Sequence, residues 1–451
     1  MKVAKFGGSS VASAEQLKKV ASIITSDPQR KCVVVSAPGK RHSGDTKVTD
    51  LLIQLAERSY NGEDYETVLS LVLDRFDEIL AELSLSKEVL GQVEDQLRSI
   101  VTGETIYTHR MDALKAAGED TLAKVLSQYL TSLGHKASYV HPKEAGIIVS
   151  NEPGRAQVLE ESYERLYELR KRDEILVIPG FFGYTIDDQL MAFPRGGSDI
   201  TGSIVAAGIQ ASLYENFTDV DSVYCVNPNI VPNPKEIVEL TYKEMRELSY
   251  AGFSVFHDEA LIPAFKARIP VSIKNTNHPD RKGTIISAER TSTNGKPVVG
   301  IASDEGFLSL YVSKYLMNRE KGFGRHLLEI LEEEDISFEH APSGIDDMSV
   351  IMRSDQLTPE KEAVIVKRIE EELRVDMVTI ERDLAMIMIV GEGMDSTIGV
   401  SSKAAQAFAS ASVNIEMINQ GSSEVSMMFG IKADRLEDAV RSLYQAFFEE
   451  E

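Results

Sequence analysis

Near the N-terminus, a lysine, two glycines and a serine form a pattern that suits the binding of an anion. Lys5 lies in a short apolar run at residues 3–6, Gly7 and Gly8 follow it, and Ser10 precedes an amphipathic, helix-like stretch. Glycine lets the backbone approach phosphate oxygens closely, and the free N–H groups of a helix N-terminus point at them. Lys5 can place a positive charge over a phosphoryl group in transfer. Taken alone, the stretch fits a tight turn with a solvated lysine equally well.

A second glycine-rich turn lies much further along the chain, at residues 195–199. It combines Arg195 with two glycines, a serine and Asp199, and an apolar, helix-like stretch begins directly after it. The guanidinium of Arg195 can bind a carboxylate or a phosphate through two parallel hydrogen bonds. Asp199 suits a charged site, but it suits the N-cap of the following helix equally well. The chain therefore carries two candidate anion-binding turns.

The elements expected around these turns alternate between strand and helix. Stretches with helical periodicity dominate residues 48–133 and recur between the later strands. This alternation predicts an α/β fold, with a three-layer αβα domain whose ligands lie beyond the carboxyl ends of its strands. The strand-like apolar runs are at residues 3–6, 31–37, 137–140, 175–178, 213–217 and 270–274.

The last third of the chain has a different pattern, which is repeated. Beyond a polar stretch that predicts a linker, the order strand, helix, strand, strand, helix, strand indicates a ferredoxin-like βαββαβ module, with one strand expected at residues 336–340. The order begins again at residue 384 but lacks its last strand, so we expect residues 298–302 to complete the second module. The expected organisation is a first domain at residues 1–286, a linker at 287–297, and modules at 305–383 and 384–451.

Composition narrows the classes of partner and compartment. The chain carries 48 lysines and arginines against 71 acidic residues, a net charge of −23. Such a surface repels nucleic acid and anionic membranes, so we expect neither as a partner, although solubility alone explains the acidity. Cys32 and Cys225 lie in apolar runs and indicate buried thiols in a reducing, cytoplasmic compartment. We expect no signal peptide, because a strand begins at once, and no protein-held metal such as zinc, because the histidine spacing does not suit one.

The two glycine-rich turns, taken together and in this order, closely resemble those of the aspartate kinases in the amino acid kinase superfamily. The two βαββαβ modules are similar to the ACT regulatory domains of that family, and the whole arrangement looks most like its lysine-sensitive, monofunctional type. The resemblance implies an αβα kinase domain followed by two ACT domains. It also implies ATP-dependent phosphorylation of the side-chain carboxylate of L-aspartate to 4-phospho-L-aspartate, the first step of lysine, threonine and methionine biosynthesis.

The resemblance also implies roles for individual residues. Lys5 would stabilise the phosphoryl group in transfer, and Asp199 would orient Lys5. From the residues alone, Glu104 is a first-turn acid that favours a helix dipole, whereas the resemblance makes it the partner of the substrate's amino group. Mg²⁺ would be held mainly by phosphate and water oxygens. The implied aspartate-binding residues are Ser36, Thr49, Glu104, Phe181, Arg195 and Ser198, and the implied ATP-binding residues are Gly7, Gly8, Ser10, Thr218, Asp219 and Tyr224.

For regulation, the resemblance implies an effector site in the first ACT module. Glu339 would pair with the side-chain ammonium of L-lysine, with L-threonine as a possible effector; without the resemblance, Glu339 fits a solvated carboxylate at a strand end. ACT modules commonly pair, so we expect a homodimer, with a tetramer as the alternative. The implied effector residues are Met317, Gly322, Phe323, Phe338 and Glu339.

Two positions depart from the family pattern at the nucleotide end. Asn227 stands where many members have aspartate, and Ser254 stands where they have lysine. These departures leave two alternatives to an active aspartate kinase. One is a catalytically inactive, amino-acid-sensing subunit, and the other is a related kinase that acts on another acid, such as glutamate or acetylglutamate.

Overall fold

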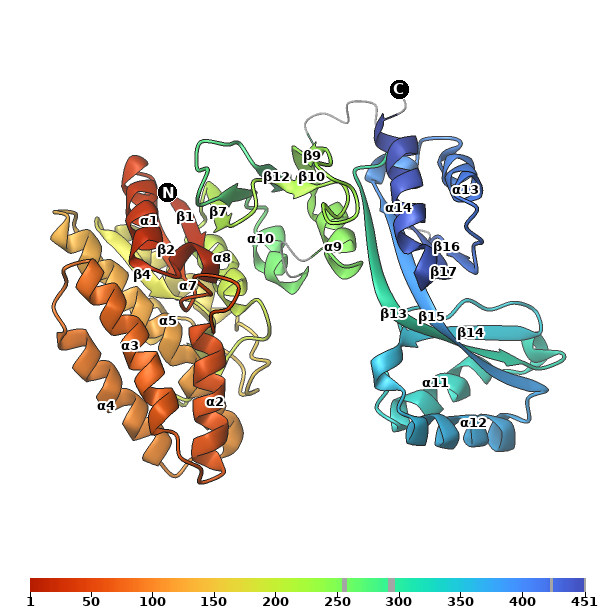
Figure 1. Cartoon of the computed structure of the whole chain (residues 1–451), viewed down its shortest axis with the longest axis horizontal. Coiled ribbons are helices and arrows are strands. Elements are labelled where there is room, and N and C mark those ends of the chain that lie inside the picture. The colour runs from red at the N-terminus through yellow and green to blue at the C-terminus, as the bar shows by residue number, and fades with distance from the viewer. Residues whose placement is uncertain (254–257, 291–296, 422–424, 450–451) are drawn as a thin grey trace. The chain divides into compact units, whose positions relative to one another are not determined.

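The computed structural model describes residues 1–253, 258–290, 297–421 and 425–449. It divides the chain into two compact units (Figure 1). The first consists of Met1–Val223, Glu236–Arg246 and Ser254–Ser292, and the second of Tyr224–Lys235, Glu247–Phe253 and Thr293–Glu451. Two segments of the expected first domain, residues 224–235 and 247–253, therefore group with the C-terminal part of the chain.

The first unit is built on an eight-stranded sheet in the order β10-β12-β11-β7-β1-β2-β4-β3. Strand β1 (Lys2–Phe6) is central and runs parallel to its neighbours β2 (Arg30–Val35) and β7 (Leu213–Thr218). These strands are buried on both faces, because helices cover both sides of the sheet. The remaining strands are β3 (Ala137–Tyr139), β4 (Ile175–Pro179), β10 (Glu239–Thr241), β11 (Val271–Asn275) and β12 (Thr284–Ser287).

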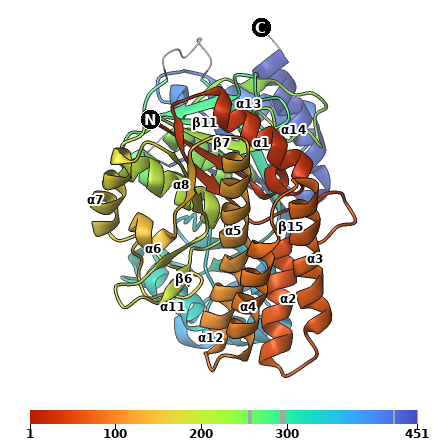
Figure 2. The ribbon, with the colours of Figure 1, turned by 90° about the vertical axis from the view of Figure 1, so that its left-hand side faces the viewer.

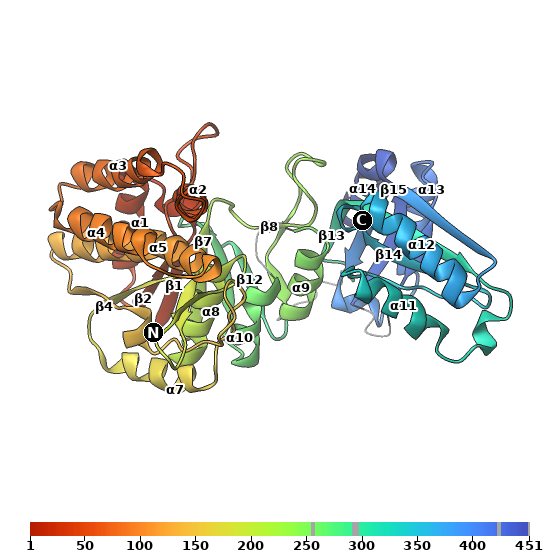
Figure 3. The same cartoon turned by 90° about the horizontal axis from the view of Figure 1, so that it is seen from below.

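Helices form the two outer layers of this unit, as Figure 3 shows, so the predicted three-layer α/β fold is confirmed. One layer carries α1 to α5, of which α2 to α5 stand side by side in Figure 2 and α1 lies above them in that view. The other layer carries α7 (Glu161–Tyr167) and α8 (Gly197–Gly208). The bounds of the first layer are α1 Ala14–Ser26, α2 Val48–Tyr60, α3 Glu66–Glu82, α4 Glu88–Thr102 and α5 Tyr107–Ser132.

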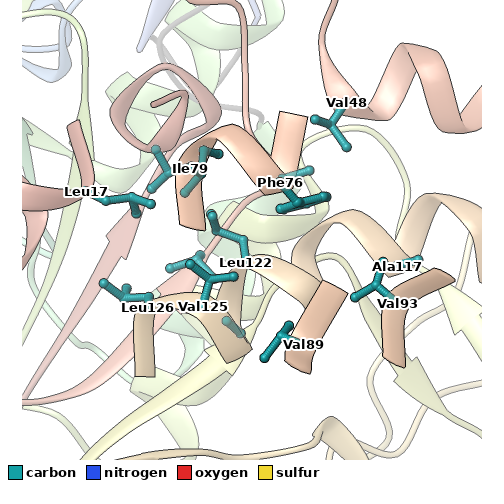
Figure 4. Packing of buried hydrophobic residues seen from close by; sticks show 14 of the residues in the cluster. Leu17, Val48, Phe76, Ile79, Val89, Val93, Ala117, Leu122, Val125 and Leu126 are labelled. Atoms are coloured by element: carbon teal, nitrogen blue, oxygen red, sulfur yellow. The ribbon is translucent and has the colours of Figure 1, made fainter. Parts of the chain in front are cut away.

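Helix α5 lies at the centre of its layer. Its side chains Leu122, Val125 and Leu126 are fully buried, in one hydrophobic cluster with Phe76 of α3 and Leu17 of α1 (Figure 4). A helix that is buried over most of its circumference belongs to the core of a domain. Polar residues of α5 that are also buried therefore need a specific partner or a function.

The second unit is built on an antiparallel sheet in the order β14-β13-β15-β17-β16. Strands β13 (Gly300–Ser313) and β15 (Met377–Val390) pair along their whole length, from Gly300 opposite Val390 to Ser313 opposite Met377. The other elements are β14 (Asp347–Arg353), β16 (Met417–Asn419), β17 (Ser426–Lys432), α11 (Phe323–Glu333), α12 (Pro359–Leu373), α13 (Val400–Ser410) and α14 (Leu436–Tyr444).

Two pairs of strands that we expected to be separate are each continuous. The expected strands at residues 298–302 and 307–312 are joined in β13, which bends at a register shift near Gly306. The expected strands at 377–381 and 384–390 are joined in β15. The predicted strand at 336–340 is wrong, because the structure forms only an isolated bridge there, between His340 and Ile351.

Other local features follow the sequence closely. Thr358 caps α12 through its hydroxyl, which accepts the N–H of Lys361 at 3.3 Å, and Pro359 occupies the first helical position. Cys32 and Cys225 are both buried, as their apolar surroundings in the sequence predict. No helix among the described residues has both the length and the apolar character needed to cross a membrane.

Candidate active site

A cavity of about 550 Å³ lies in the first unit, at the carboxyl ends of the central strands. Its walls come from the turn after β1, the loop after β2, the first turns of α2 and α8, and the middle of α5. This is the edge at which parallel α/β sheets bind ligands. The predicted site residues that line it are Gly8, Ser36, Thr49, Phe181, Ser198, Asp199 and Asp219.

An ion pair between Lys5 and Asp199 joins the two glycine-rich turns at this cavity. Lys5 Nζ lies 2.5 Å from Asp199 Oδ1, and the Lys5 side chain is only 7% exposed. Asn216, which is opposite Lys5 in the sheet, donates from Nδ2 to the same carboxylate oxygen at 2.8 Å. The N-cap of α8 is Gly196, so the alternative that Asp199 is the N-cap is wrong. The contact of the Asp199 carboxylate with Lys5 is compatible with the orienting role predicted for Asp199.

Close backbone contact between two loops forms one end of the cavity. The N–H of Gly39, in the loop after β2, donates to the Gly8 carbonyl at 2.9 Å. A Cβ on Gly39 would lie 2.6 Å from the carbonyl carbon of Gly8, which real Cβ atoms do not approach so closely. Glycine is therefore required at position 39 for the two loops to meet. Gly7 faces the lysine, since a Cβ there would lie 3.5 Å from Lys5 Nζ.

Phe181 is held in a strained backbone conformation on the cavity wall. Its φ is +80°, which is unfavourable for a residue with a Cβ. Hydrogen bonds fix this conformation: the Phe181 N–H donates to Thr201 Oγ1 at 2.9 Å, and its carbonyl accepts the N–H of Phe193 at 2.8 Å. Gly197 lies against the Phe181 ring, where any Cβ would clash. Such strain persists where a site needs a fixed geometry.

Glu119 is a site residue that the sequence reasoning missed. It lies in the middle of α5, is 5% exposed and lines the cavity. Burial raises the pKa of its carboxyl group to about 8. Its Oε2 atom is buried and has no hydrogen-bond partner within the described residues, so this oxygen is left to accept a proton or bind a cation. The available signal was an acidic residue directly after the small residues Ala116, Ala117 and Gly118.

Glu104 does not reach this cavity. It lies in the exposed loop between α4 and α5, and it is absent from the cavity wall. The predicted role of Glu104 as partner of the substrate's amino group therefore stays a prediction, and the acidic residue of α5 that does line the cavity is Glu119. The other interpretation of Glu104, as an acid in the first turn of a helix, is wrong, because Glu104 lies before α5 and is not part of its first turn.

The remaining predicted substrate and nucleotide residues lie at or near the cavity, with one exception. Arg195 is exposed and precedes Gly196, which is part of the cavity wall. Ser10 is buried behind the wall, where its hydroxyl accepts from Thr276 Oγ1 at 2.7 Å. The Thr218 hydroxyl donates to Asp219 at 3.1 Å. Tyr224 belongs to the second unit.

The predicted effector residues form two groups in the second unit. Met317 and Phe323 are buried in the same hydrophobic cluster, and Gly322 is the N-cap of α11 with φ of +86°. Phe338 is exposed, whereas Glu339 is tied to its surroundings. The Glu339 carboxylate accepts a hydrogen bond from the Tyr250 hydroxyl and lies 3.8 Å from Nε of Arg353. No contact joins the two groups among the interactions described.

Of the two positions that depart from the family pattern, the structure describes one, Asn227. Asn227 has a local structural role in the second unit, because its side-chain oxygen accepts the N–H of Asn229 at 3.0 Å. This contact is the turn-forming bond typical of asparagine. Ser254 lies outside the described residues.

Comparison with known proteins agrees with the fold and the cavity. Sequence models of the amino acid kinase family and of an ACT domain match residues 1–275 and 387–447. The chain is 58% identical to aspartokinase 3 of Bacillus subtilis (strain 168), over 99% of each chain. Its structure resembles Clostridium acetobutylicum aspartate kinase with a TM-score of 0.88 at 37% identity, covering 99% of this chain and 100% of that one. E. coli aspartokinase III gives a TM-score of 0.81 over 99% and 100% of the two chains, and at 24% identity it shows the fold alone.

The chain therefore belongs to the amino acid kinase family. Within this family it is an aspartate kinase that carries an ACT domain in its C-terminal part. The resemblance seen in the two glycine-rich turns is thus confirmed, as are the predicted fold class and the enzyme class.

Replacing Lys5 tests the charge at the centre of the site. We expect Lys5→Met to lower kcat by about 100-fold or more, because it removes a preorganised positive charge from the transition state. Methionine keeps an apolar stem in the buried strand, and thermal unfolding checks that the fold is retained. Lys2→Met is the matched control, since Lys2 lies on the same strand but pairs with Asp27 away from the cavity. Steady-state ADP formation with near-normal kcat in Lys5→Met would refute the role.

The raised pKa of Glu119 predicts how the stability of the folded protein depends on pH. The pKa of Glu119 is about 8 in the folded protein and near its ordinary value of 4.5 when unfolded. Between these values the folded state binds more protons, so Glu119 makes stability fall as pH rises. Glu119→Gln removes this titration. We expect its free energy of unfolding to exceed that of the wild type by about 2–4 kcal/mol at pH 8.5, and by little at pH 5.

Urea unfolding at both pH values measures this difference. Glu82→Gln, at the exposed end of α3, is a control in which no such widening is expected. If the free energies of unfolding of Glu119→Gln and the wild type differ by the same amount at pH 5 and pH 8.5, Glu119 ionises normally in the folded protein.

Proposed function

We propose that this enzyme transfers the γ-phosphoryl group of ATP to the side-chain carboxylate of L-aspartate and so forms 4-phospho-L-aspartate. The observation that carries the proposal is the buried Lys5–Asp199 ion pair where two glycine-rich turns meet at one cavity. Phosphoryl transfer requires the reactants to be aligned and the charge on the transferring group to be stabilised, and it requires little covalent participation from the protein. A fixed ammonium group beside free backbone N–H groups supplies such stabilisation.

The cavity has separate groups for the two ends of an amino-acid substrate. The buried carboxyl group of Glu119 suits the α-ammonium group, whose positive charge would favour ionised Glu119. The hydroxyls of Ser36, Thr49 and Ser198 suit the carboxylates. Arg195, which directly precedes Gly196 of the cavity wall, is a further candidate partner for them. In this arrangement Asp199 keeps the Lys5 ammonium directed at the transferring phosphoryl group.

The nucleotide would bind at the end formed by Gly7, Gly8 and Asp219, with Thr218 on its adenosine side. The role implied for Tyr224 in ATP binding stays a prediction. The E. coli relative was solved with aspartate and ADP bound, which supports aspartate as the substrate and an adenine nucleotide as the second ligand. The described residues contain no cluster of three or more side chains suited to a metal ion. Carboxylates on the wall, such as Asp219, fit Mg²⁺ that is bound chiefly through phosphate oxygens and water, where it would neutralise phosphate charge.

We further propose that L-lysine inhibits the enzyme through the first ACT module, with L-threonine as the second possibility. Glu339 is the candidate partner for the lysine side-chain ammonium, since its carboxylate is held by a tyrosine and lies at the rim of the module. A homodimer through the ACT modules, or a tetramer, would place effector sites between subunits. The E. coli relative was solved with lysine and aspartate, in a state named T. A cytoplasmic location and a role in lysine, threonine and methionine biosynthesis complete the proposal.

Turnover with different acids tests the proposed reaction. We expect ADP release from MgATP with L-aspartate, little or none with L-glutamate or N-acetylglutamate, and a decrease on addition of L-lysine. A coupled assay measures ADP release with each acid, with and without L-lysine, and ³¹P NMR identifies the phosphorylated product. Turnover with glutamate or acetylglutamate alone would favour a related kinase. No turnover by folded protein that still binds lysine would favour the inactive sensor, and Asn227 and Ser254 would then become the first positions to restore.

Replacing Glu339 tests the effector site. We expect Glu339→Ala to raise the lysine concentration for half-inhibition by about tenfold or more and to leave uninhibited kcat nearly unchanged, because it removes a charge-assisted contact. Glu320→Ala is the matched control, since Glu320 is an acid of the same module that pairs with Lys314. Inhibition curves measured by ADP release give the lysine concentration for half-inhibition in both variants. Equal sensitivity in the Glu339 variant and the control would move the effector contact elsewhere.

A further inference from the structure

The loop between β2 and α2 supplies the positive charge on the cavity wall. Lys40 and Lys47 are the basic residues on that wall within the described part of the chain, while Glu119, Asp199 and Asp219 are its acidic residues. Lys5 pairs with Asp199 from behind the wall. An anionic substrate that approaches a chain of net charge −23 therefore meets this loop as its main source of attraction.

Both lysines are available to a ligand. Their side chains are exposed, and the ion pairs of the described residues include none that engages either ammonium group. Lys47 is the N-cap residue of α2, and Thr49, a candidate substrate residue, follows in its first turn. An ammonium group at this point faces the same space as the hydroxyls proposed to bind substrate carboxylates.

A single buried arginine holds the loop that carries these lysines. Arg75 lies on α3, and its side chain is 4% exposed. Its guanidinium donates to the Gly39 carbonyl at 3.1 Å, to the Thr46 carbonyl at 3.2 Å, and to both carboxylate oxygens of Asp45 at 2.7 Å. One planar group thus ties both ends of the loop, next to Lys40 at one end and next to Lys47 at the other.

Asp45 completes the attachment. Its carboxylate also accepts hydrogen bonds from the backbone N–H of Arg41 at 2.9 Å and from Nε of Arg41 at 3.0 Å. Arg41 and Arg75 together hold the pKa of Asp45 well below its usual range, so the carboxylate stays ionised at every pH at which the enzyme would work. Arg41 in turn pairs with Glu78 of α3 at 2.5 Å. The loop is therefore fixed to α3 by charged hydrogen bonds from four of its residues, Gly39, Arg41, Asp45 and Thr46.

We infer that Lys40 and Lys47 bind the anionic groups of the substrates, and that Arg75 is a positioning residue that acts through them. The inference rests on the proposed function and deepens it, because it identifies the cationic residues of the same site. The shared chemistry is an anion, which is either the carboxylate of the amino acid or the phosphate of the nucleotide. The closeness of Lys47 to Thr49 places at least this lysine on the amino-acid side.

Charge-neutral variants of the lysines test the first half of the inference. We expect Lys40→Gln and Lys47→Gln each to raise one KM by about tenfold, with a smaller change in kcat, because each loses a charge-assisted contact. A rise in KM for L-aspartate identifies a carboxylate ligand, and a rise in KM for MgATP identifies a phosphate ligand. The double variant should also show a weaker dependence of that KM on salt. Lys18→Gln, an exposed lysine of α1 away from the cavity, is the control for the change in net charge.

A double-mutant cycle tests whether Arg75 acts through Lys40 and Lys47. Arg75→Lys keeps the charge but loses the planar fork, so we expect it to raise the same KM as the lysine variants. In the Lys40→Gln, Lys47→Gln background, Arg75→Lys should have no further effect on this KM, because the residues through which it acts are gone. A purely structural role would lower stability and activity in either background. Arg98→Lys is the control, since Arg98 also bonds to α3, through Glu66, but does not contact the loop.

The outcomes separate this inference from the proposed function. If the wild type turns over but the double lysine variant keeps both KM values, or if the effect of Arg75→Lys is additive, the inference is overturned and the proposed function stands. If the wild type does not turn over, calorimetric titration with ADP and with L-aspartate decides the inference. Affinity reduced about tenfold in the double lysine variant supports it, and unchanged affinity for both ligands overturns it.

Discussion

The buried pair of Lys5 and Asp199 is the contact on which the site depends. An ammonium group this far from water is stable only beside a carboxylate with further hydrogen bonds, which Asn216 completes. The three residues lie in β1, α8 and β7. Their contacts therefore fix strand β1, the first turn of α8 and strand β7 relative to one another. The close contact between Gly8 and Gly39 then brings the loop after β2 to the same point.

Much of this arrangement could be predicted from the sequence, because its signals are local. Lys5 with its two glycines, and Ser198 with Asp199, each lie within a single strand-to-helix or loop-to-helix turn. In a parallel sheet, such turns must meet at the carboxyl edge, whatever connects them. The same reasoning predicted the α/β fold, the cap at Thr358 and the repeated pattern of the C-terminal part. These features depend on a few neighbouring residues, and long-range packing cannot easily overrule them.

Other parts of the site depend on contacts between distant residues. Glu119 stands in the middle of a long helix, where the sequence pattern alone does not show that this position lines a cavity. Glu104 received its role from the family resemblance and not from its own surroundings in the sequence. Lys40 and Lys47 look like ordinary residues of a polar loop until Arg75 of α3 is seen to hold that loop. The strand expected at residues 336–340 failed for a similar reason: its apolar residues Ile336 and Phe338 have strand spacing, but the neighbouring strand accepts only one bridge there.

The continuous strands of the second unit have a consequence for the evolution and engineering of the enzyme. Because β13 and β15 each run through both modules, no point between residues 305 and 384 offers a cut that leaves two complete sheets. A chain divided there would expose unpaired strand edges, which promote aggregation. Regulatory regions of related kinases should therefore be exchanged only as one cassette, with crossover points before β13, and a single duplicated module inserted on its own should not fold.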